Sequence, residues 1–184
     1  MHNDSRVHMV ESAAALISAR GASATSFSLV LEESGAPRGS IYHHFPDGKR
    51  QLTEEAMQLT SQRVLEYQRR VVATTPLDVL EHFIALWRSV VDSSNGARGC
   101  AIAGVAIDAD PESESLIDAA AVIFRSWSSL LQEQFVAVGT DPDRASPLAV
   151  VTLAALEGAL ILCRSERSVT PLDTVATQLR RLVT

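Results

Sequence analysis

The chain has 184 residues, of which 46% are hydrophobic, 21% charged and 5% aromatic. This is the balance of a soluble globular protein, and the scarcity of aromatic residues favours helices over a β-sandwich or barrel. The two cysteines are too few for a disulfide scaffold or a zinc site. Charged residues interrupt every apolar stretch before the ~18 residues that a membrane span needs. No signal peptide is recognisable at the start, so we expect a cytoplasmic, all-α protein.

The first predicted helix runs from Arg6 to the residue before Gly21. Apolar residues recur at helical spacing from Val7 to Ile17, and Gly21 stops the helix. The residues before Arg6 are polar and are expected to fray.

Two short helices joined by a glycine turn are predicted between Thr25 and Arg50. Ser26 can cap the first helix, and Gly35 supplies the left-handed residue that ends it. The second helix is predicted from Pro37 to Phe45, because the N–H that proline lacks would be unpaired at a helix start anyway. Its residues Ile41 and Phe45 are four apart and are expected to pack inward.

The second helix presents arginine, serine, tyrosine and histidine side chains outward. Such a surface on a short helix held by a tight turn is typical of a helix-turn-helix that enters the DNA major groove. Arg38 can reach a guanine edge or a phosphate, and Ser40 can bond to a base or the backbone. The others suit phosphate contacts, which position the protein without reading sequence. The predicted DNA-binding residues are Thr25, Ser26, Arg38, Gly39, Ser40, Tyr42, His43 and Lys49.

The segment TSFSLVLEESGAPRGSIYHHFPDGK resembles the DNA-binding segment of the tetracycline-repressor (TetR) family of bacterial regulators. The shared pattern is a helix started by Thr or Ser, a glycine turn and a recognition helix that ends Tyr-x-His-Phe. The region from Val7 to Ala56 fits this pattern. The chain departs from the family in two ways. Pro37 stands where a polar helix start is commoner, and the linker from Pro46 to Lys49 is one residue longer than usual.

The net charge of −6 is unusual for a DNA-binding protein. Residues 1–50 carry five basic and five acidic side chains, histidine excluded, so the negative charge lies entirely after residue 50. The acidic remainder would repel DNA from everything except the N-terminal helices. Because these helices are not strongly basic, we expect modest affinity for non-specific DNA.

A long helix is predicted from Gly48 to about Val71 and would join the N-terminal helices to the remainder of the chain. Breakers rich in Gly, Pro, Ser and Asp separate the later helices. Helices are expected at about 77–91, 99–108, 147–164 and 172–183. A further helix is expected between a break at 110–113 and residue 135, which gives about nine helices in all. The expected domains are 1–50 for DNA binding and 51–184 for ligand binding and dimerisation.

The last two predicted helices are too apolar for the outside of a monomer. Small residues there allow close helix approach, and a second copy would complete a four-helix interface about a two-fold axis. The alternative is that these residues pack on the core of their own chain. The predicted interface residues are Leu148, Val151, Ala155, Leu156, Ala159, Leu162, Leu172, Val175 and Leu179.

The middle helices carry residues suited to an apolar ligand pocket, although each also fits an ordinary core. Trp87 and Trp127 are favoured because an indole N–H needs a partner. Glu157 is a lone charge in an apolar helix, and it suits a polar ligand group, an arginine partner or a position at the interface rim. The predicted ligand-binding residues are Phe83, Trp87, Ile102, Val105, Phe124, Trp127, Leu131, Glu157 and Leu160.

The resemblance implies a homodimeric repressor of a palindromic double-stranded DNA operator. A small effector would shift the long helix and change the spacing of the two DNA-binding heads. We expect no enzyme, cofactor or metal, because the sequence lacks the nucleophile, nucleotide-loop and metal motifs. The alternative is a non-specific DNA-binding or protein-interaction helical module without an effector.

Overall fold

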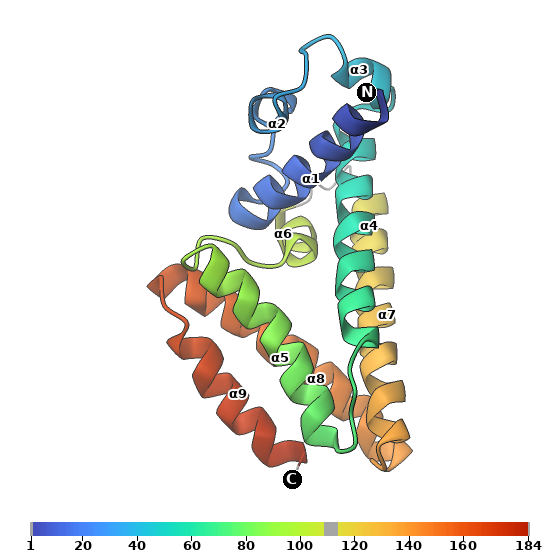
Figure 1. Cartoon of the computed structure of the whole chain (residues 1–184), viewed down its shortest axis with the longest axis vertical. Coiled ribbons are helices and arrows are strands. Elements are labelled where there is room, and N and C mark those ends of the chain that lie inside the picture. The colour runs from blue at the N-terminus through green and yellow to red at the C-terminus, as the bar shows by residue number, and fades with distance from the viewer. Residues whose placement is uncertain (1, 109–113, 184) are drawn as a thin grey trace. The chain divides into compact units, whose positions relative to one another are not determined.

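The computed structural model describes residues 2–108 and 114–183, and every regular element within those ranges is an α-helix (Figure 1). The break expected at 110–113 lies outside the described residues. The helices are α1 (His2–Arg20), α2 (Phe27–Ser34), α3 (Ile41–His44), α4 (Gly48–Arg69), α5 (Pro76–Ser93), α6 (Ala101–Asp108), α7 (Glu114–Ala137), α8 (Pro142–Glu166) and α9 (Thr170–Val183).

The helices lie close to their predicted positions, and the main differences occur where helices start. α1 begins at His2, in the segment that was expected to fray. α8 begins at Pro142 rather than at residue 147, because the side chain of Asp141 caps it by accepting a hydrogen bond of 2.9 Å from the N–H of Asp143. Pro147 therefore lies inside α8 and removes one intrahelical hydrogen bond.

The recognition helix α3 is shorter than predicted. Pro37 precedes it in a turn, in which the backbone N–H and the hydroxyl of Ser40 both donate to the carbonyl of Pro37, at 2.9 and 2.7 Å. Such a bond between residues three apart closes a tighter turn than an α-helix does. Gly39 lies within this turn and disfavours helix. Only residues from Ile41 onward are helical.

The chain divides into two compact units. Unit 1 comprises residues 1–62 and 100–122, and unit 2 comprises residues 63–99 and 123–184. α4 and α7 each contribute residues to both units. The predicted boundary at residue 50 falls inside the continuous helix α4, so the division into 1–50 and 51–184 stays a prediction about function.

In unit 1, α1 packs against α2 and α6 (Figure 1). Val30 of α2, Ile41 of α3 and Phe45 after α3 are each 0% exposed, which confirms the predicted inward packing of the last two. These three apolar side chains attach both short helices to the core of unit 1.

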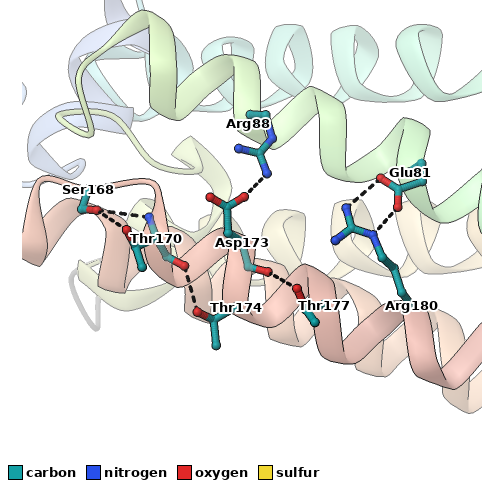
Figure 2. Close-up of polar contacts among 8 residues, drawn as sticks. All are labelled: Glu81, Arg88, Ser168, Thr170, Asp173, Thr174, Thr177 and Arg180. Carbon is teal, nitrogen blue, oxygen red and sulfur yellow. Dashed lines mark hydrogen bonds and ion pairs between the residues drawn. The ribbon is translucent and has the colours of Figure 1, made fainter.

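In unit 2, α5, α8 and α9 pack against one another. Two ion pairs join α9 to α5, Asp173 with Arg88 and Arg180 with Glu81 (Figure 2). The hydrogen bonds that Arg180 donates to the carboxylate of Glu81 raise the pKa of Arg180 above its ordinary value. All four side chains are at least one-third exposed, so each pair contributes at most about 1 kcal/mol.

The apolar face of α9 is buried against α5 and α8. Burial of apolar surface is the larger stabilising effect here, at about 25 cal/mol for each Å². The buried residues of this helix are Pro171, Leu172, Ala176 and Leu179.

The C-terminal end of α4 is fixed within unit 2 by side chains of α5 and α7. The amide of Gln68 donates to the side-chain oxygen of Gln134 at 2.8 Å, and the amide of Gln134 donates to the backbone carbonyl of Gln68 at 2.9 Å. His82 Nε2 lies 2.9 Å from the carbonyl oxygen of Tyr67 and its ring stacks on the tyrosine. Carbonyls that lack partners within the last helical turn are thereby satisfied.

Leu172→Ala is expected to lower the free energy of unfolding by about 2–5 kcal/mol, because a fully buried side chain is lost. Arg88→Gln is the matched control at the same helix pair, and its loss should stay below about 1 kcal/mol. Urea unfolding followed by circular dichroism measures both losses. Equal losses would show that charge, rather than apolar burial, holds α9.

Candidate nucleic-acid interface and effector site

The helix-turn-helix is built by local capping. The side chain of Ser26 accepts a hydrogen bond of 3.3 Å from the N–H of Leu29 and starts α2. Gly35 ends α2 with a φ of +66°, a left-handed conformation that glycine adopts without strain. Both local predictions are confirmed, so the sequence between Ser26 and Gly35 specifies the length of α2.

Most of the predicted DNA-binding residues are presented to solvent. Tyr42 is 70% exposed, and its ring packs edge-on against Phe27, with centroids 5.6 Å apart. This contact holds the tyrosine beside the start of α2 without burying it. The exposed members of the predicted set are Ser26, Arg38, Gly39, Tyr42, His43 and Lys49.

Two of the predicted DNA-binding side chains make hydrogen bonds within the protein. The hydroxyl of Thr25 donates to the carbonyl of Gly21 at 2.8 Å, and Thr25 is only 4% exposed. The hydroxyl of Ser40 donates to the carbonyl of Pro37, and this residue is half-buried. Thr25 therefore closes the turn before α2 and does not offer its hydroxyl to a phosphate.

The basic side chains near α3 differ in how far they are neutralised. Arg50 pairs with Glu54 at 2.7 Å, and Arg6 pairs with Glu55 at 2.6 Å while lying over the ring of Phe45. Arg38 has no ion-pair partner among the residues that the structure describes. Its charge is therefore available to an anion.

Four of the predicted ligand-binding residues form one aromatic cluster in unit 2. Ring centroids lie 6.0 Å apart between Phe83 and Trp87, 5.9 Å apart between Trp87 and Trp127, and 5.6 Å apart between Phe124 and Trp127. Both indole N–H groups are buried and lack an acceptor among the described residues. A buried hydrogen-bond donor without a partner lowers stability by about 1–3 kcal/mol. This cluster therefore differs from an ordinary apolar core, in which buried polar groups are hydrogen-bonded.

The remaining predicted ligand residues divide between the two units. Leu131, Glu157 and Leu160 belong to unit 2, and both carboxylate oxygens of Glu157 are shielded from solvent. Ile102 and Val105 belong to α6 in unit 1 and are fully buried there. The hydroxyl of Thr152 in α8, which the sequence did not single out, is also buried without a partner among the described residues.

Four of the nine predicted interface residues lie inside the core of their own unit. Leu156, Ala159, Leu172 and Leu179 are each at most 3% exposed, so they cannot meet a second copy without unfolding. Helical period places apolar residues on two faces of α8, and the sequence prediction selected part of the wrong face. Val151 and Leu162 are exposed, whereas Leu148, Ala155 and Val175 are half-buried.

An apolar stripe remains exposed along α8. Its members are single residues or adjacent pairs that recur every three or four residues, and they therefore share one side of the helix. Ile161 is 54% exposed and Val150 is 55% exposed, which is unusual for such side chains in a row. We call this set the α8 stripe: Val150, Val151, Ala154, Gly158, Ile161 and Leu162.

The sequence matches two described protein families. Residues 10–56 match "Bacterial regulatory proteins, tetR family", and residues 76–178 match "Transcriptional regulator LmrA/YxaF-like, C-terminal domain". An HTH-type transcriptional regulator of Mycobacterium tuberculosis is 43% identical over 183 residues, covering 97% of this chain and 93% of the relative.

Solved structures share the fold over nearly the whole chain. A TetR transcriptional regulator from Chloroflexus aurantiacus matches with a TM-score of 0.79 and 26% identity, over 98% of this chain and 94% of that one. The TetR family regulator CifR, a cysteine mutant in complex with 26-bp double-strand operator DNA, matches with a TM-score of 0.78 and 21% identity. That match covers 97% of this chain and 96% of CifR.

Arg38→Ala is expected to relax sequence preference at one position of each half-site, at about 1–3 kcal/mol, because an arginine that reads a guanine discriminates by that amount. Lys49→Ala should instead weaken all duplexes alike and reduce the salt slope by about one. Fluorescence anisotropy on matched and mismatched duplexes across a salt series separates the two effects. A uniform loss for Arg38→Ala would identify it as a phosphate contact. Gln58→Ala, an exposed change on α4, is the control.

Proposed function

Since this chain belongs to the TetR family of bacterial transcriptional regulators, we propose that it represses transcription by binding a palindromic operator as a homodimer. In this proposal a small, largely apolar effector releases it from DNA. The protein is a DNA-binding regulator and not an enzyme. Its place of action is therefore the cytoplasm, where the DNA is.

The observation that carries the DNA-binding proposal is the arrangement around α3. Ile41 and Phe45 are completely buried, while Arg38, Tyr42 and His43 around them are exposed. Apolar anchors thus hold a polar surface toward solvent, as a recognition helix requires. The solved structure of CifR, which shares the fold, is a complex with operator DNA, and this supports the same use of the surface here.

The α8 stripe supports the homodimer. A row of exposed valine, isoleucine and leucine side chains with two small residues among them allows a second helix to approach closely. A two-fold axis would pair the stripe with itself, so that one surface serves both copies. The two heads would then read half-sites about one turn of DNA apart, near 34–36 Å.

The aromatic cluster of unit 2 supports an effector site. An effector with an apolar body and a hydrogen-bond acceptor would stack on the rings and satisfy one of the indole N–H groups. The end of α4 is fixed in the same unit by Gln68 and Gln134, so a change in unit 2 acts directly on the long helix that leads to α3. Release then requires that the effector bind the DNA-free state more tightly.

Selection of random duplex DNA on the purified protein tests the proposal. Enrichment of a palindromic sequence with two half-sites supports a dimeric, sequence-specific regulator and supplies the operator for effector screening. Weak, salt-sensitive binding without enrichment would overturn it and favour a non-specific DNA-binding role. If no small molecule weakens operator binding, the proposal of an effector is overturned and the proposal of sequence-specific DNA binding is unaffected.

Ile161→Glu is expected to convert the dimer to a monomer, because the substitution would place two carboxylates at a self-complementary apolar contact. Operator affinity should fall with it. Val72→Glu is the matched control, since Val72 is 93% exposed, lies between α4 and α5 and is not part of the α8 stripe. Analytical ultracentrifugation measures both. A dimer that survives the Ile161→Glu change would place the interface elsewhere.

Trp127→Phe is expected to leave operator affinity unchanged without effector and to weaken the effector response about tenfold. The phenyl ring keeps the apolar wall but lacks the indole N–H, whose hydrogen bond is worth about 1–1.5 kcal/mol. Titration of the effector into a protein–operator complex measures the change. Phe124→Leu alters the wall and keeps the N–H, so an equal loss there would show that packing, not hydrogen bonding, binds the effector.

A further inference from the structure

Ser23, in the turn between α1 and α2, uses all of its polar groups on distant segments. Its N–H donates to the two carboxylate oxygens of Asp108 at 3.0 and 3.1 Å. Its hydroxyl lies 2.8 Å from the Oδ1 of Asp108 and 2.8 Å from the carbonyl of the same residue. Its own carbonyl accepts a hydrogen bond of 3.0 Å from the ammonium of Lys49. An exposed serine in a turn needs none of these partners, because water can form the same hydrogen bonds.

Asp108 is the last residue of α6, and two glycines bring that helix against the end of α1 (Figure 1). A Cβ on Gly21 would lie 2.2 Å from Oδ2 of Asp108. A Cβ on Gly104 of α6 would lie 3.2 Å from the carbonyl of Ile17. A side chain at position 21 would therefore have to displace the carboxylate of Asp108 and adopt a strained φ of +84°. A side chain at position 104 would push against the backbone of α1, so glycine at both positions favours the close approach of α6.

Ser23 and its partner Lys49 lie on either side of the helix-turn-helix in the sequence. Ser23 lies three residues before the cap of α2, and the turn between them is closed by the hydroxyl of Thr25 on the carbonyl of Gly21. Lys49 is the second residue of α4, directly after the loop that follows α3. The contacts of Ser23 therefore link the segment that enters the motif to the segment that leaves it.

We propose that Asp108 is a positioning residue for DNA binding, and that Asp108, Ser23 and Lys49 form a latch that sets the orientation of α2 and α3. The latch also places the ammonium of Lys49, a predicted phosphate contact. Charge-assisted hydrogen bonds of 2.8–3.1 Å weaken steeply as they lengthen. A small displacement of α6 therefore releases the turn before α2. The effector-dependent use of the latch rests on the function proposed above, whereas its effect on operator affinity does not require an effector.

The substitution Asp108→Asn tests the latch on the full-length protein and the selected operator. The amide keeps the size of the side chain but offers one acceptor oxygen in place of two. Operator affinity is expected to fall about tenfold, the effect of losing hydrogen bonds to a charged group. Removing a negative charge would by itself strengthen DNA binding, so the expected loss cannot arise from long-range electrostatics.

Four further variants keep the test specific. Asp118→Asn removes an exposed carboxylate from α7 in the same unit and should leave affinity unchanged or slightly higher. Ser23→Ala should lower affinity by about threefold, and Ser23→Thr, which retains the hydroxyl, should restore it. The double variant Asp108→Asn with Ser23→Ala should lose less than the product of the single losses, because both changes break the same contact.

Thermal unfolding shows whether each variant is folded. Operator binding by the wild-type protein is measured in parallel. Asp108→Asn protein that binds the operator as tightly as wild type, or more tightly, would overturn the latch. Fully independent losses in the double variant would also overturn it. A wild-type protein that selects no operator would instead refute the proposed function, so the two failures are distinguishable. If Asp108→Asn unfolds, the Ser23 pair of variants decides the question alone.

Discussion

The DNA-binding surface depends on the burial of two apolar side chains beneath a helix of four residues. α3 contains a single turn, and an isolated turn is not stable in water because helix nucleation fixes more dihedral angles than one hydrogen bond compensates. Ile41 and Phe45, both fully buried, therefore determine where α3 lies. Since they provide the anchoring, the residues between and before them are free to be polar.

The local features of this motif could be predicted from sequence because each has a local cause. Ser26 caps α2 and Gly35 ends it through contacts within a few residues. The length of α3 was overestimated, because helical periodicity does not distinguish a helix from the tight turn that Pro37 and Ser40 form before it. The burial of Thr25 depends on how the turn after α1 folds back onto the carbonyl of Gly21, which residue type does not reveal.

The features that sequence could not supply are contacts between distant segments. α8 is apolar on two sides, so periodicity could not tell which side meets the core. Leu156 turned out to be buried and Ile161 exposed. The contact between Ser23 and Asp108 joins residues 85 positions apart, and neither belongs to a recognisable motif. For the same reason the sequence singled out Trp87 and Trp127 as ligand-binding candidates but could not show that their rings pack together or that their N–H groups lack partners among the described residues.

The contact between Gly21 and Asp108 has a consequence for how this chain can diverge. Gly21 combines a φ of +84° with a carboxylate oxygen where a Cβ would stand. A larger residue at position 21 would therefore strain the backbone and displace the carboxylate of Asp108. Substitution at either position changes what the other can accommodate, so the two positions are coupled across 87 residues of sequence, as the numbering shows. Homologues with a side chain at position 21 should accordingly lack aspartate at position 108, and an alignment would register this physical contact as covariation.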